Sequence, residues 1–324
     1  MVMRAIEIVD GRLIWQETQK PSPGFGEVLI KVSATAVNRA DLSQVAGGYP
    51  PPPGASNILG LECSGTVVEV GSQVGSFKIG DEVCALLSGG GYAEYVNVAA
   101  GQVLPKPNRL TLVEAAALPE VFATAYLNIY MEASASVGES VLIHSGASGV
   151  GTAAIQLCKA FGNPCFVTVG FDAKVRACQK LGATAGCNRR VEDFEARVLE
   201  WTGDMGVDVI LDPVGGRYLA SNLRCLAVDG RLVVIGLMGG ADATLPLGRM
   251  MVKRQRVIGS TLRARSIEAK SAVMSQLFER VWPRIESGDV NAIVDHTIPI
   301  EDAQEAHDLI RTDQTIGKVV LVAE

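Results

Sequence analysis

The chain has 324 residues, more than the roughly 100 to 200 that one hydrophobic core ordinarily serves, so its length predicts two domains. Its formal net charge of -6 at pH 7 opposes a polyanionic partner, and we expect no nucleic-acid binding. Hydrophobic residues make up 48% of the chain and charged residues 20%, which is typical of a globular enzyme and excludes a disordered or collagen-like protein.

Cysteine usage and hydropathy predict a soluble cytoplasmic protein. The seven cysteines are an odd number, form no C-x-x-C pair and lie mostly in apolar stretches, so we expect buried, reduced thiols. The N-terminus lacks the apolar stretch of a signal peptide, and no uninterrupted apolar run reaches the roughly 18 residues of a membrane span. The scattered basic residues are expected to be solvated surface: Arg189, Arg190, Lys253, Arg254, Arg256, Arg263 and Arg265.

The first 121 residues show strand-like patterning. The stretch EVLIKVSA alternates apolar and polar positions, and SGTVVEV, DEVCALL and YAEYVNV follow it, each bounded by Gly, Pro or Asp. Among them, residues 47–60 (GGYPPPPGASNILG) carry four consecutive prolines, which remove the N–H donors that a central strand needs. We therefore predict a β-rich lobe with a stiff surface loop that forms the wall of a cleft.

A helix is predicted to begin after Thr111, and the periodicity then changes. Thr111 and Glu114 have the spacing of a capping box. Beyond them, the apolar runs SVLIH, CFVTVG, VDVILD, RLVVIGL and RVIGSTL alternate with helical stretches such as residues 150–161. Continuous apolar strands that alternate with helices predict a parallel sheet covered on both faces, the doubly wound α/β architecture that binds nucleotides.

The C-terminal part of the chain is expected to return to the first lobe, so that the cleft lies between two lobes. Its apolar spacing predicts one long amphipathic helix over 266–288, a second helix in EDAQEAHDLIRT and a final strand in GKVVLVA. The expected domains are therefore residues 1–121 with 264–324, and residues 122–263.

The sequence SGASGVG lies between an apolar strand and a helix, where doubly wound folds bind a nucleotide pyrophosphate. Gly146 would permit the tight turn and Gly151 the close packing of the helix. The N-terminus of that helix, at Gly149 and Val150, would direct free N–H groups at the phosphates. Ser148 replaces the usual middle glycine, and its small hydroxyl side chain fits there and can add a hydrogen bond. The alternative is a purely structural turn.

The end of the next strand indicates which nicotinamide cofactor binds. Gly170 stands where an acidic residue would hold the ribose hydroxyls of NAD, about 20 residues beyond the glycine loop. The missing carboxylate leaves room for a 2′-phosphate, with which Lys174 and Arg189 could pair, and this favours NADPH. Asp172 competes with this interpretation, since it could hold the ribose instead; its plainer role is to cap the helix that begins near Ala173.

The motifs of this chain, taken together, resemble one known family over essentially the whole length. NRADLSQ, PPPGASNILGLECSG, GGGYAEYV, AAALPEVFATAY, VLIHSGASGVGTAAIQL and IGKVVL are similar in content and order to the zinc-free quinone oxidoreductase (zeta-crystallin-like) branch of the medium-chain dehydrogenases/reductases. Within that branch the chain is most similar to the tumour-suppressor-inducible quinone oxidoreductase subgroup. The resemblance implies a GroES-like β-rich catalytic domain and a Rossmann domain.

The same resemblance implies that no metal takes part. Catalytic zinc needs three converging ligands and an open position, yet the corresponding positions hold Asn38, Leu61 and Glu120, and no cysteine cluster follows Ala85. We therefore expect no zinc-polarised alcohol chemistry. A nicotinamide must instead be positioned against an acceptor that is already electrophilic, such as a quinone or an activated enone.

The resemblance also implies a set of site residues. Asn38 and Tyr49 would be the catalytic residues near the nicotinamide, where Asn38 hydrogen-bonds the ribose or the acceptor oxygen and Tyr49 orients the substrate. Thr124 would contact the nicotinamide side, and Lys318 would help at the phosphates. The loop that covers the carboxamide would consist of Gly236, Leu237 and Met238.

Each of these residues has a plainer alternative. Asn38 can cap the helix RADLSQVA, and Tyr49 can stack in the proline-rich turn. Thr124 can serve packing, and Lys318 can face solvent. His144 is expected to be a packed core residue, so the proton for the reaction is expected from water or from Tyr49.

The leading prediction is NADPH-dependent reduction of a quinone by hydride transfer in the cleft between the lobes. The enzymatic alternative is reduction of 2-alkenals or enoyl thioesters on the same scaffold, and the non-enzymatic one is an NADPH-binding protein of crystallin-like or RNA-binding type. By resemblance the chain is expected to form a homodimer, or a tetramer, through RVIGSTL at the outer edge of the parallel sheet. No membrane partner is expected.

Overall fold

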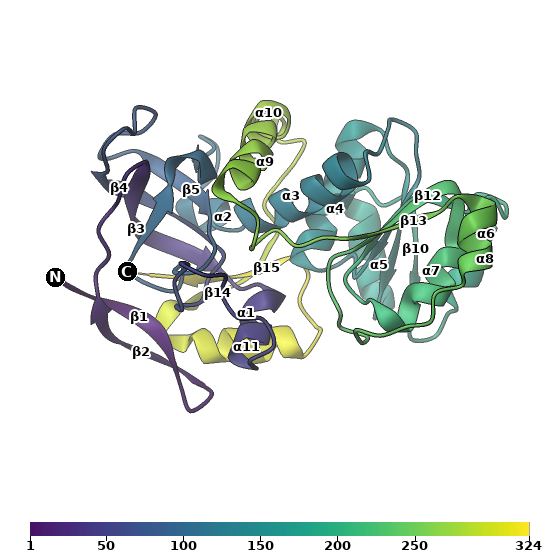
Figure 1. Cartoon of the computed structure of the whole chain (residues 1–324), viewed down its shortest axis with the longest axis horizontal. Coiled ribbons are helices and arrows are strands. Elements are labelled where there is room, and N and C mark those ends of the chain that lie inside the picture. Colours follow the sequence, from purple (N-terminus) through teal and green to yellow (C-terminus); the bar gives the residue numbers. More distant parts are fainter. Residues whose placement is uncertain (324) are drawn as a thin grey trace. The chain divides into compact units, whose positions relative to one another are not determined.

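The structure is a computed structural model that describes residues 1–323, and it divides into two compact units. The first unit comprises Met1–Ala123 and the chain from Leu262 onward, and the second is Thr124–Thr261 (Figure 1). The domain boundaries expected from the sequence lie between residues 121 and 122 and between residues 263 and 264. One unit is thus built from both ends of the chain and the other from its middle.

The first unit is built on a seven-stranded sheet whose strands run in the order β14, β15, β3, β4, β5 and β7, with β6 also paired to β3. The bounds are β3 Glu27–Ala36, β4 Glu62–Val70, β5 Glu82–Leu86, β6 Tyr95–Ala99, β7 Val103–Pro105, β14 Val294–Pro299 and β15 Lys318–Val322. A separate antiparallel hairpin consists of β1 (Val2–Val9) and β2 (Arg12–Gln19). Through β14 and β15 the C-terminal part of the chain belongs to the same sheet as the N-terminal part.

The alternation of apolar and polar residues in EVLIKVSA matches the two faces of β3. Val28, Ile30 and Val32 lie on one face of the strand and share a core with Val67 of β4 and Val83 of β5. Lys31, which points to the opposite face, is exposed.

Helices of this unit begin at the caps that the sequence predicts. α1 (Arg39–Val45) follows Asn38, and α2 (Leu112–Ala115) follows Thr111. The Thr111 hydroxyl accepts a hydrogen bond from the backbone N–H of Glu114 (3.2 Å), and the Glu114 carboxylate accepts one from the backbone N–H of Thr111 (2.8 Å). The predicted capping box is confirmed.

The prediction of a single helix over 266–288 is wrong. The chain forms α9 (Ile267–Arg280) and α10 (Trp282–Ser287) instead, and α11 (Ala303–Arg311) follows later. The break lies at Val281, two residues before Pro283. Pro283 has no N–H to donate, and in a continuous helix its ring would clash with the carbonyl group four residues earlier.

The second unit is a six-stranded parallel sheet in the order β10, β9, β8, β11, β12, β13. The bounds are β8 Val141–His144, β9 Cys165–Val169, β10 Ala185–Asn188, β11 Val207–Asp212, β12 Leu226–Val234 and β13 Arg256–Gly259. Numbered along the chain, this is the 3-2-1-4-5-6 order of the Rossmann fold, so the predicted fold class is confirmed. The order reverses between β8 and β11, and in such sheets ligands bind where the strands on either side of the reversal end.

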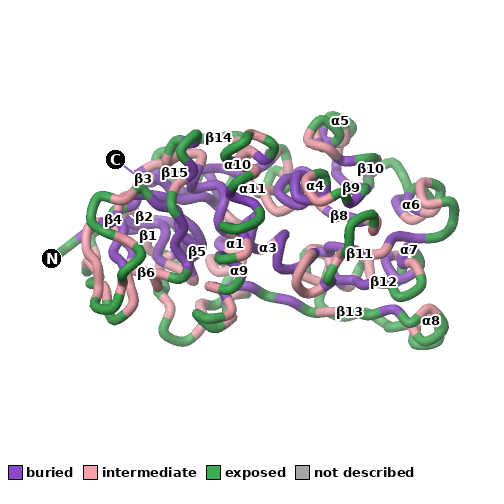
Figure 2. Tube along the Cα trace, turned by 90° about the horizontal axis from the view of Figure 1, so that it is seen from above, coloured by how far each residue is buried: buried purple, intermediate pink, exposed green. Residues whose placement is uncertain are grey.

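Five helices accompany this sheet: α4 Gly149–Phe161, α5 Asp172–Leu181, α6 Phe194–Thr202, α7 Leu219–Cys225 and α8 Leu247–Lys253. β10 was not predicted, because its four residues include a glycine and an asparagine and no β-branched side chain. β13 is the edge strand of the sheet, as predicted, and it is largely exposed (Figure 2).

The helical run Leu112–Glu132 joins α2, α3 (Pro119–Tyr126) and the π-helical turn η2 (Leu127–Glu132). It is long and apolar enough to cross a membrane by length and composition alone. Because 72% of its most apolar window is buried inside the protein, the run has the character of a core helix.

Candidate functional site

The turn between β8 and α4 leaves no room for side chains at two of its glycines. A Cβ at Gly146 would lie 2.7 Å from the Cβ of Val167 on β9, and one at Gly151 would lie 2.4 Å from the carbonyl oxygen of Ser145. The left-handed residue of the turn is Ser145, at φ +56°, and not Gly146. The expected roles are therefore corrected: Gly146 permits close packing on the neighbouring strand, and Gly151 lets the helix approach its own turn.

Ser148 caps α4. Its Oγ accepts a hydrogen bond from the backbone N–H of Gly151 at 3.0 Å, and its side chain is exposed. Gly149 and Val150 form the first turn, where backbone N–H groups have no partner within the helix. The 13-residue helix therefore presents N–H groups and the positive end of its dipole at the carboxyl end of β8, an arrangement suited to a phosphate.

Strand β9 is followed by Gly170, which is buried and adds no side chain at this point. The interpretation of Asp172 as a helix cap is wrong, because Phe171 is the N-cap of α5 and Asp172 is the first helical residue. The carboxylate of Asp172 accepts a hydrogen bond from the side-chain amide of Asn188 at 2.7 Å, which ties it to the end of β10.

Basic side chains gather around Phe171. The ammonium nitrogen of Lys174 lies 5.9 Å from the centre of the Phe171 ring, and the guanidinium carbon of Arg190 lies 4.0 Å from it. Arg189, by contrast, hydrogen-bonds the side chain of Tyr218. The structure thus groups Lys174 with Arg190. Arg190 was expected to be solvated surface, because nothing in the sequence distinguishes it from the adjacent Arg189.

His144, at the end of β8, is a packed core residue as predicted. Its Nδ1 lies 2.9 Å from the hydroxyl of Thr168, and its Nε2 lies 2.8 Å from the amide oxygen of Asn222, which bonds Asp212 in turn. The amide oxygen can only accept, so Nε2 carries the proton and Nδ1 accepts from Thr168. Burial lowers the pKa of His144 to about 4 and raises the pKa of Asp212 to about 6.

Thr124 and the loop Gly236–Met238, two of the features expected near the nicotinamide, lie in the second unit. The loop Gly236–Met238 follows β12, and the N–H of Met238 donates to the carbonyl oxygen of Pro213 at 3.3 Å. Leu237 and Met238 are about half exposed, at 56% and 50%. Thr124 is half-buried in α3, and its carbonyl oxygen accepts a hydrogen bond from the side chain of Asn128 (2.7 Å).

In the first unit, Asn38 is the centre of a buried polar network. Its backbone N–H donates to the carboxylate of Asp41 at 2.8 Å, which is one of the hydrogen bonds expected if Asn38 caps α1. Its side chain does something else: Nδ2 donates to Oε1 of Glu62 (2.9 Å) and to the carbonyl oxygen of Ala36 (3.1 Å), and Oδ1 accepts from Nζ of Lys318 (2.7 Å).

Lys318 is neither a surface lysine nor free for a phosphate. It is 3% exposed, and its ammonium group donates to the carbonyl oxygen of Val37 (2.7 Å), to Asn38 and to Oε1 of Glu62 (2.8 Å). These three acceptors account for all three of its N–H donors, which corrects the expectation that Lys318 helps at the phosphates.

Sheet register explains how these residues meet. In the antiparallel pair β15·β3, Val320 faces Ala36, so Lys318 at the start of β15 lies opposite Asn38 just beyond the end of β3. In β3·β4, Thr35 faces Cys63, which sets Glu62 beside the end of the same strand. Glu62 was missed because the strand that it begins, ECSGTVVEV, contains other polar residues, and only the structure shows that this glutamate is fully buried.

Arg263 contacts both the backbone and the ring of Tyr49. Nη1 of Arg263 donates to the carbonyl oxygen of Tyr49 at 3.2 Å, and its guanidinium carbon lies 5.5 Å from the centre of the ring. Arg263 is only 3% exposed, which corrects its expected assignment to solvated surface. Burial, together with the nearby negative charge of Glu120, raises the pKa of the Tyr49 phenol, and Arg263 opposes this shift.

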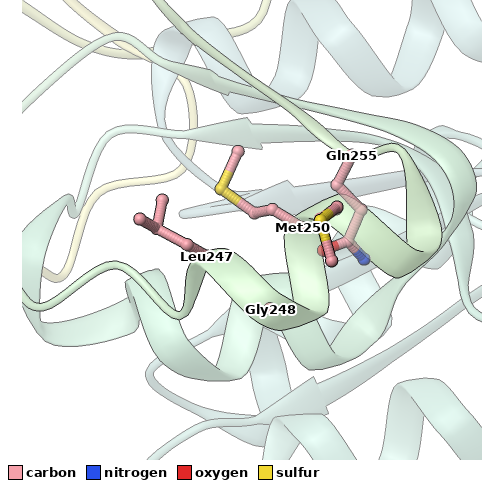
Figure 3. Close-up of a pocket in the computed structure, with 5 residues that line it drawn as sticks. Leu247, Gly248, Met250 and Gln255 are labelled. Carbon is pink, nitrogen blue, oxygen red and sulfur yellow. The ribbon is translucent and has the colours of Figure 1, made fainter.

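Within residues 1–323, no group of three or more His, Cys, Asp or Glu side chains lies close enough to hold a metal ion. An open apolar hollow of about 450 Å³ lies on α8, lined by Leu247, Gly248, Met250, Met251 and Gln255 (Figure 3). None of these lining residues belongs to the predicted site.

Comparisons with known proteins cover nearly the whole chain. The family model described as Alcohol dehydrogenase GroES-like domain matches residues 24–108, and the one described as Zinc-binding dehydrogenase matches residues 149–280. The protein named Quinone oxidoreductase of Rattus norvegicus is 31% identical over 304 residues, which are 93% of this chain and 91% of that protein.

Two solved structures illustrate the range of similar folds. Escherichia coli quinone oxidoreductase complexed with NADPH has a TM-score of 0.88 and 28% identity and covers 100% of both chains. The apo form of JamJ enoyl reductase has a TM-score of 0.87 and 27% identity and covers 99% of both chains. Because the names of these two structures state different activities, similarity of fold leaves the acceptor open.

Proposed function

The chain belongs to the zinc-free quinone oxidoreductase family of the medium-chain dehydrogenases/reductases, and from that premise we propose that it reduces a quinone with NADPH. The observation that carries the proposal is the turn at the N-terminus of α4, where Gly146 and Gly151 leave no room for a side chain, followed by buried Gly170 and the basic pair at Phe171. The parallel-sheet unit would bind the cofactor, and the β-rich unit would supply the groups that bind the acceptor.

The turn at β8 fits a pyrophosphate because main-chain N–H groups can approach it closely. Gly146 and Gly151 would be strained by any side chain, and Gly149 and Val150 supply the N–H donors. Ser148 uses its oxygen as an acceptor in the cap, so its hydroxyl hydrogen is left to donate to a phosphate oxygen. When bound, NADPH supplies the hydride. Thr124 and the loop Gly236–Met238 remain our candidates for the nicotinamide end.

Selectivity for the 2′-phosphate would come from charge. Gly170 offers no carboxylate to repel it, and the buried Lys174 and the exposed Arg190 both lie near the ring of Phe171. Arg189 stays in the candidate set because it follows the end of β10 directly, although its side chain is engaged with Tyr218. Asp172 is the group that an NAD-dependent enzyme would use.

Quinone reduction needs one hydride and one proton, and this chain has groups for the proton. A phenol is protonated at neutral pH, and burial raises the pKa of Tyr49 further, so the Tyr49 hydroxyl can donate a hydrogen bond to the acceptor oxygen. Arg263 holds the backbone of Tyr49 in place. Water would supply the proton to the reduced oxygen, directly or through Tyr49.

Reduction of a 2-alkenal or an enoyl thioester is the second candidate. It is favoured by one observation, the similarity to JamJ enoyl reductase over 99% of the chain. Both reactions would use the same cofactor turn, so the acceptor alone distinguishes them.

The chain is also proposed to form a homodimer through β13. This strand is the edge of the parallel sheet, it is largely exposed, and an unpaired edge of this kind can add a second copy across a two-fold axis.

The test is cofactor oxidation by the purified protein, with NADPH and NADH compared against one ortho-quinone and one 2-alkenal. Turnover of the quinone with NADPH supports the proposal. Turnover of the alkenal alone supports the second candidate. Failure to bind either cofactor at near-millimolar concentration would contradict both.

A further inference from the structure

We propose that the buried ion pair of Glu62 and Lys318 is a positioning device that fixes the orientation of the Asn38 amide, so that Asn38 offers its ligand only a hydrogen-bond acceptor. The ligand group it would take is a hydroxyl. This inference rests on the proposed function and on the expectation from the sequence that Asn38 lies near the nicotinamide. It extends that function by assigning two residues that touch neither cofactor nor acceptor.

A count of donors and acceptors carries the argument. The amide nitrogen of Asn38 has two hydrogens, and both are donated, to Glu62 (2.9 Å) and to the carbonyl oxygen of Ala36 (3.1 Å). The amide oxygen has two lone pairs, and one accepts from Lys318 at 2.7 Å. The unused capacity of this half-buried side chain is therefore a single lone pair.

The opposite orientation of the amide is excluded by charge. Turning the amide over would set its NH₂ group against the ammonium of Lys318 and its oxygen against the carboxylate of Glu62. Two charge-assisted hydrogen bonds would be lost. In their place, a donor would face a donor at Lys318 and an acceptor would face an acceptor at Glu62. Neither ion can move aside, since both are almost fully buried and are 2.8 Å apart.

The ion pair is itself held on both sides. Lys318 donates to the carbonyl oxygen of Val37 at 2.7 Å, and the second oxygen of Glu62 accepts from the backbone N–H of Glu120 at 2.9 Å. Both partners of Asn38 are thus fixed to backbone groups, which is what a positioning role requires.

The consequence concerns which group Asn38 can recognise. An acceptor cannot bind the carbonyl oxygen of a quinone, which itself only accepts. Asn38 can take a hydrogen bond from a hydroxyl, either of the cofactor ribose or of the hydroquinone that forms when a quinone is reduced. Donation to the quinone oxygen would then fall to Tyr49.

An exchange of partners tests the proposal. Asn38→Asp alone sets two carboxylates side by side, and Glu62→Gln alone leaves Lys318 without its counter-ion. The double variant Asn38→Asp with Glu62→Gln restores one amide and one carboxylate, and it keeps an acceptor at position 38. We expect each single variant to lower kcat/KM about 10- to 100-fold and the double variant to recover most of that loss.

A matched control is available in the same unit. The side chain of Asn97 donates to Glu27 at 2.8 Å, so Asn97→Asp makes the same chemical change at a pair outside the site. It is expected to leave the kinetics unchanged. A loss concentrated in the dissociation constant of NADPH identifies the ribose hydroxyl as the ligand, whereas a loss in kcat at an unchanged constant identifies the hydroxyl of the reduced acceptor.

The orientation can also be measured without catalysis. In protein labelled with ¹⁵N-asparagine, the side-chain signals of Asn38 are expected to be slow to exchange with solvent and to shift in Glu62→Gln. This readout tests the positioning claim even if the wild-type protein reduces no quinone. The proposal is overturned if the double variant is no more active than the single variants, because a donor at position 38 would then be required, or if Glu62→Gln leaves the Asn38 signals unchanged.

Should Asn38→Asp fail to fold, the paired change Glu62→Gln with Lys318→Met decides the matter. It removes both groups that orient the amide and keeps the net charge. We expect kcat/KM to fall about 10- to 100-fold and two sets of Asn38 side-chain signals to appear. Wild-type kinetics with a single set would overturn the proposal.

Discussion

Replacing Gly151 by alanine tests the cofactor turn directly. The added Cβ would lie 2.4 Å from the carbonyl oxygen of Ser145 and 2.5 Å from that of Gly146, and real Cβ atoms essentially never approach within 3.0 Å of another atom. Both obstacles are backbone atoms, so no side chain can turn away. The turn must open by at least about 0.6 Å, the difference between 3.0 and 2.4 Å.

Two effects of Gly151→Ala can be estimated. Forcing an extra carbon into a closely packed site costs roughly 1–3 kcal/mol of unfolding free energy. Displacement of the N–H groups that face the pyrophosphate, equivalent to losing one hydrogen bond to a charged group, weakens NADPH binding about 10- to 100-fold. The first effect is measured by urea denaturation and the second by titration of NADPH fluorescence.

Gly248→Ala is the matched control, since Gly248 also lies in the first turn of a helix but has nothing within 4 Å of the position its Cβ would take. Alanine there is expected to leave NADPH binding unchanged and to stabilise the helix slightly. If Gly151→Ala binds NADPH as tightly as the wild type and unfolds at the same urea concentration, the reasoning about the turn is refuted.

Four further predictions follow from individual side chains. Lys174→Met should weaken NADPH binding about 10-fold or more and leave NADH binding unchanged, as titration with both cofactors would reveal. Tyr49→Phe should lower kcat with little change in the dissociation constant of NADPH; equal kcat values would remove Tyr49 from the reaction. The pKa of His144 is about 4 in the folded protein and 6.5 ordinarily, so the free energy of unfolding should decrease by on the order of 3 kcal/mol as the pH falls from 6.5 toward 4. His144→Gln should remove this pH dependence, as urea denaturation at several pH values would show. Val257→Asp, on the exposed edge strand, should shift a dimer to the monomer mass in sedimentation equilibrium, and a wild type that sediments only as a monomer would contradict the dimer.

Features that depend on short stretches of chain could be predicted from the sequence. The glycine turn, the capping box at Thr111 and the edge position of β13 each follow from a few neighbouring residues or from the order of strands. The local errors also have local causes. Pro283 divides a helix that the apolar spacing alone made continuous, and Ser145, not Gly146, adopts the left-handed conformation of the turn.

What the sequence determined by itself is therefore the architecture, since the alternation of strands and helices along the chain is enough to specify a Rossmann sheet and a β-rich unit. Only the tertiary structure decided the roles of Asn38, Glu62 and Lys318. Asn38 and Lys318 are 280 positions apart in the chain, and Asn38 and Glu62 are 24 apart. They meet because the register of β3 with β4 and with β15 sets them at one strand end, and register depends on the packing of whole strands.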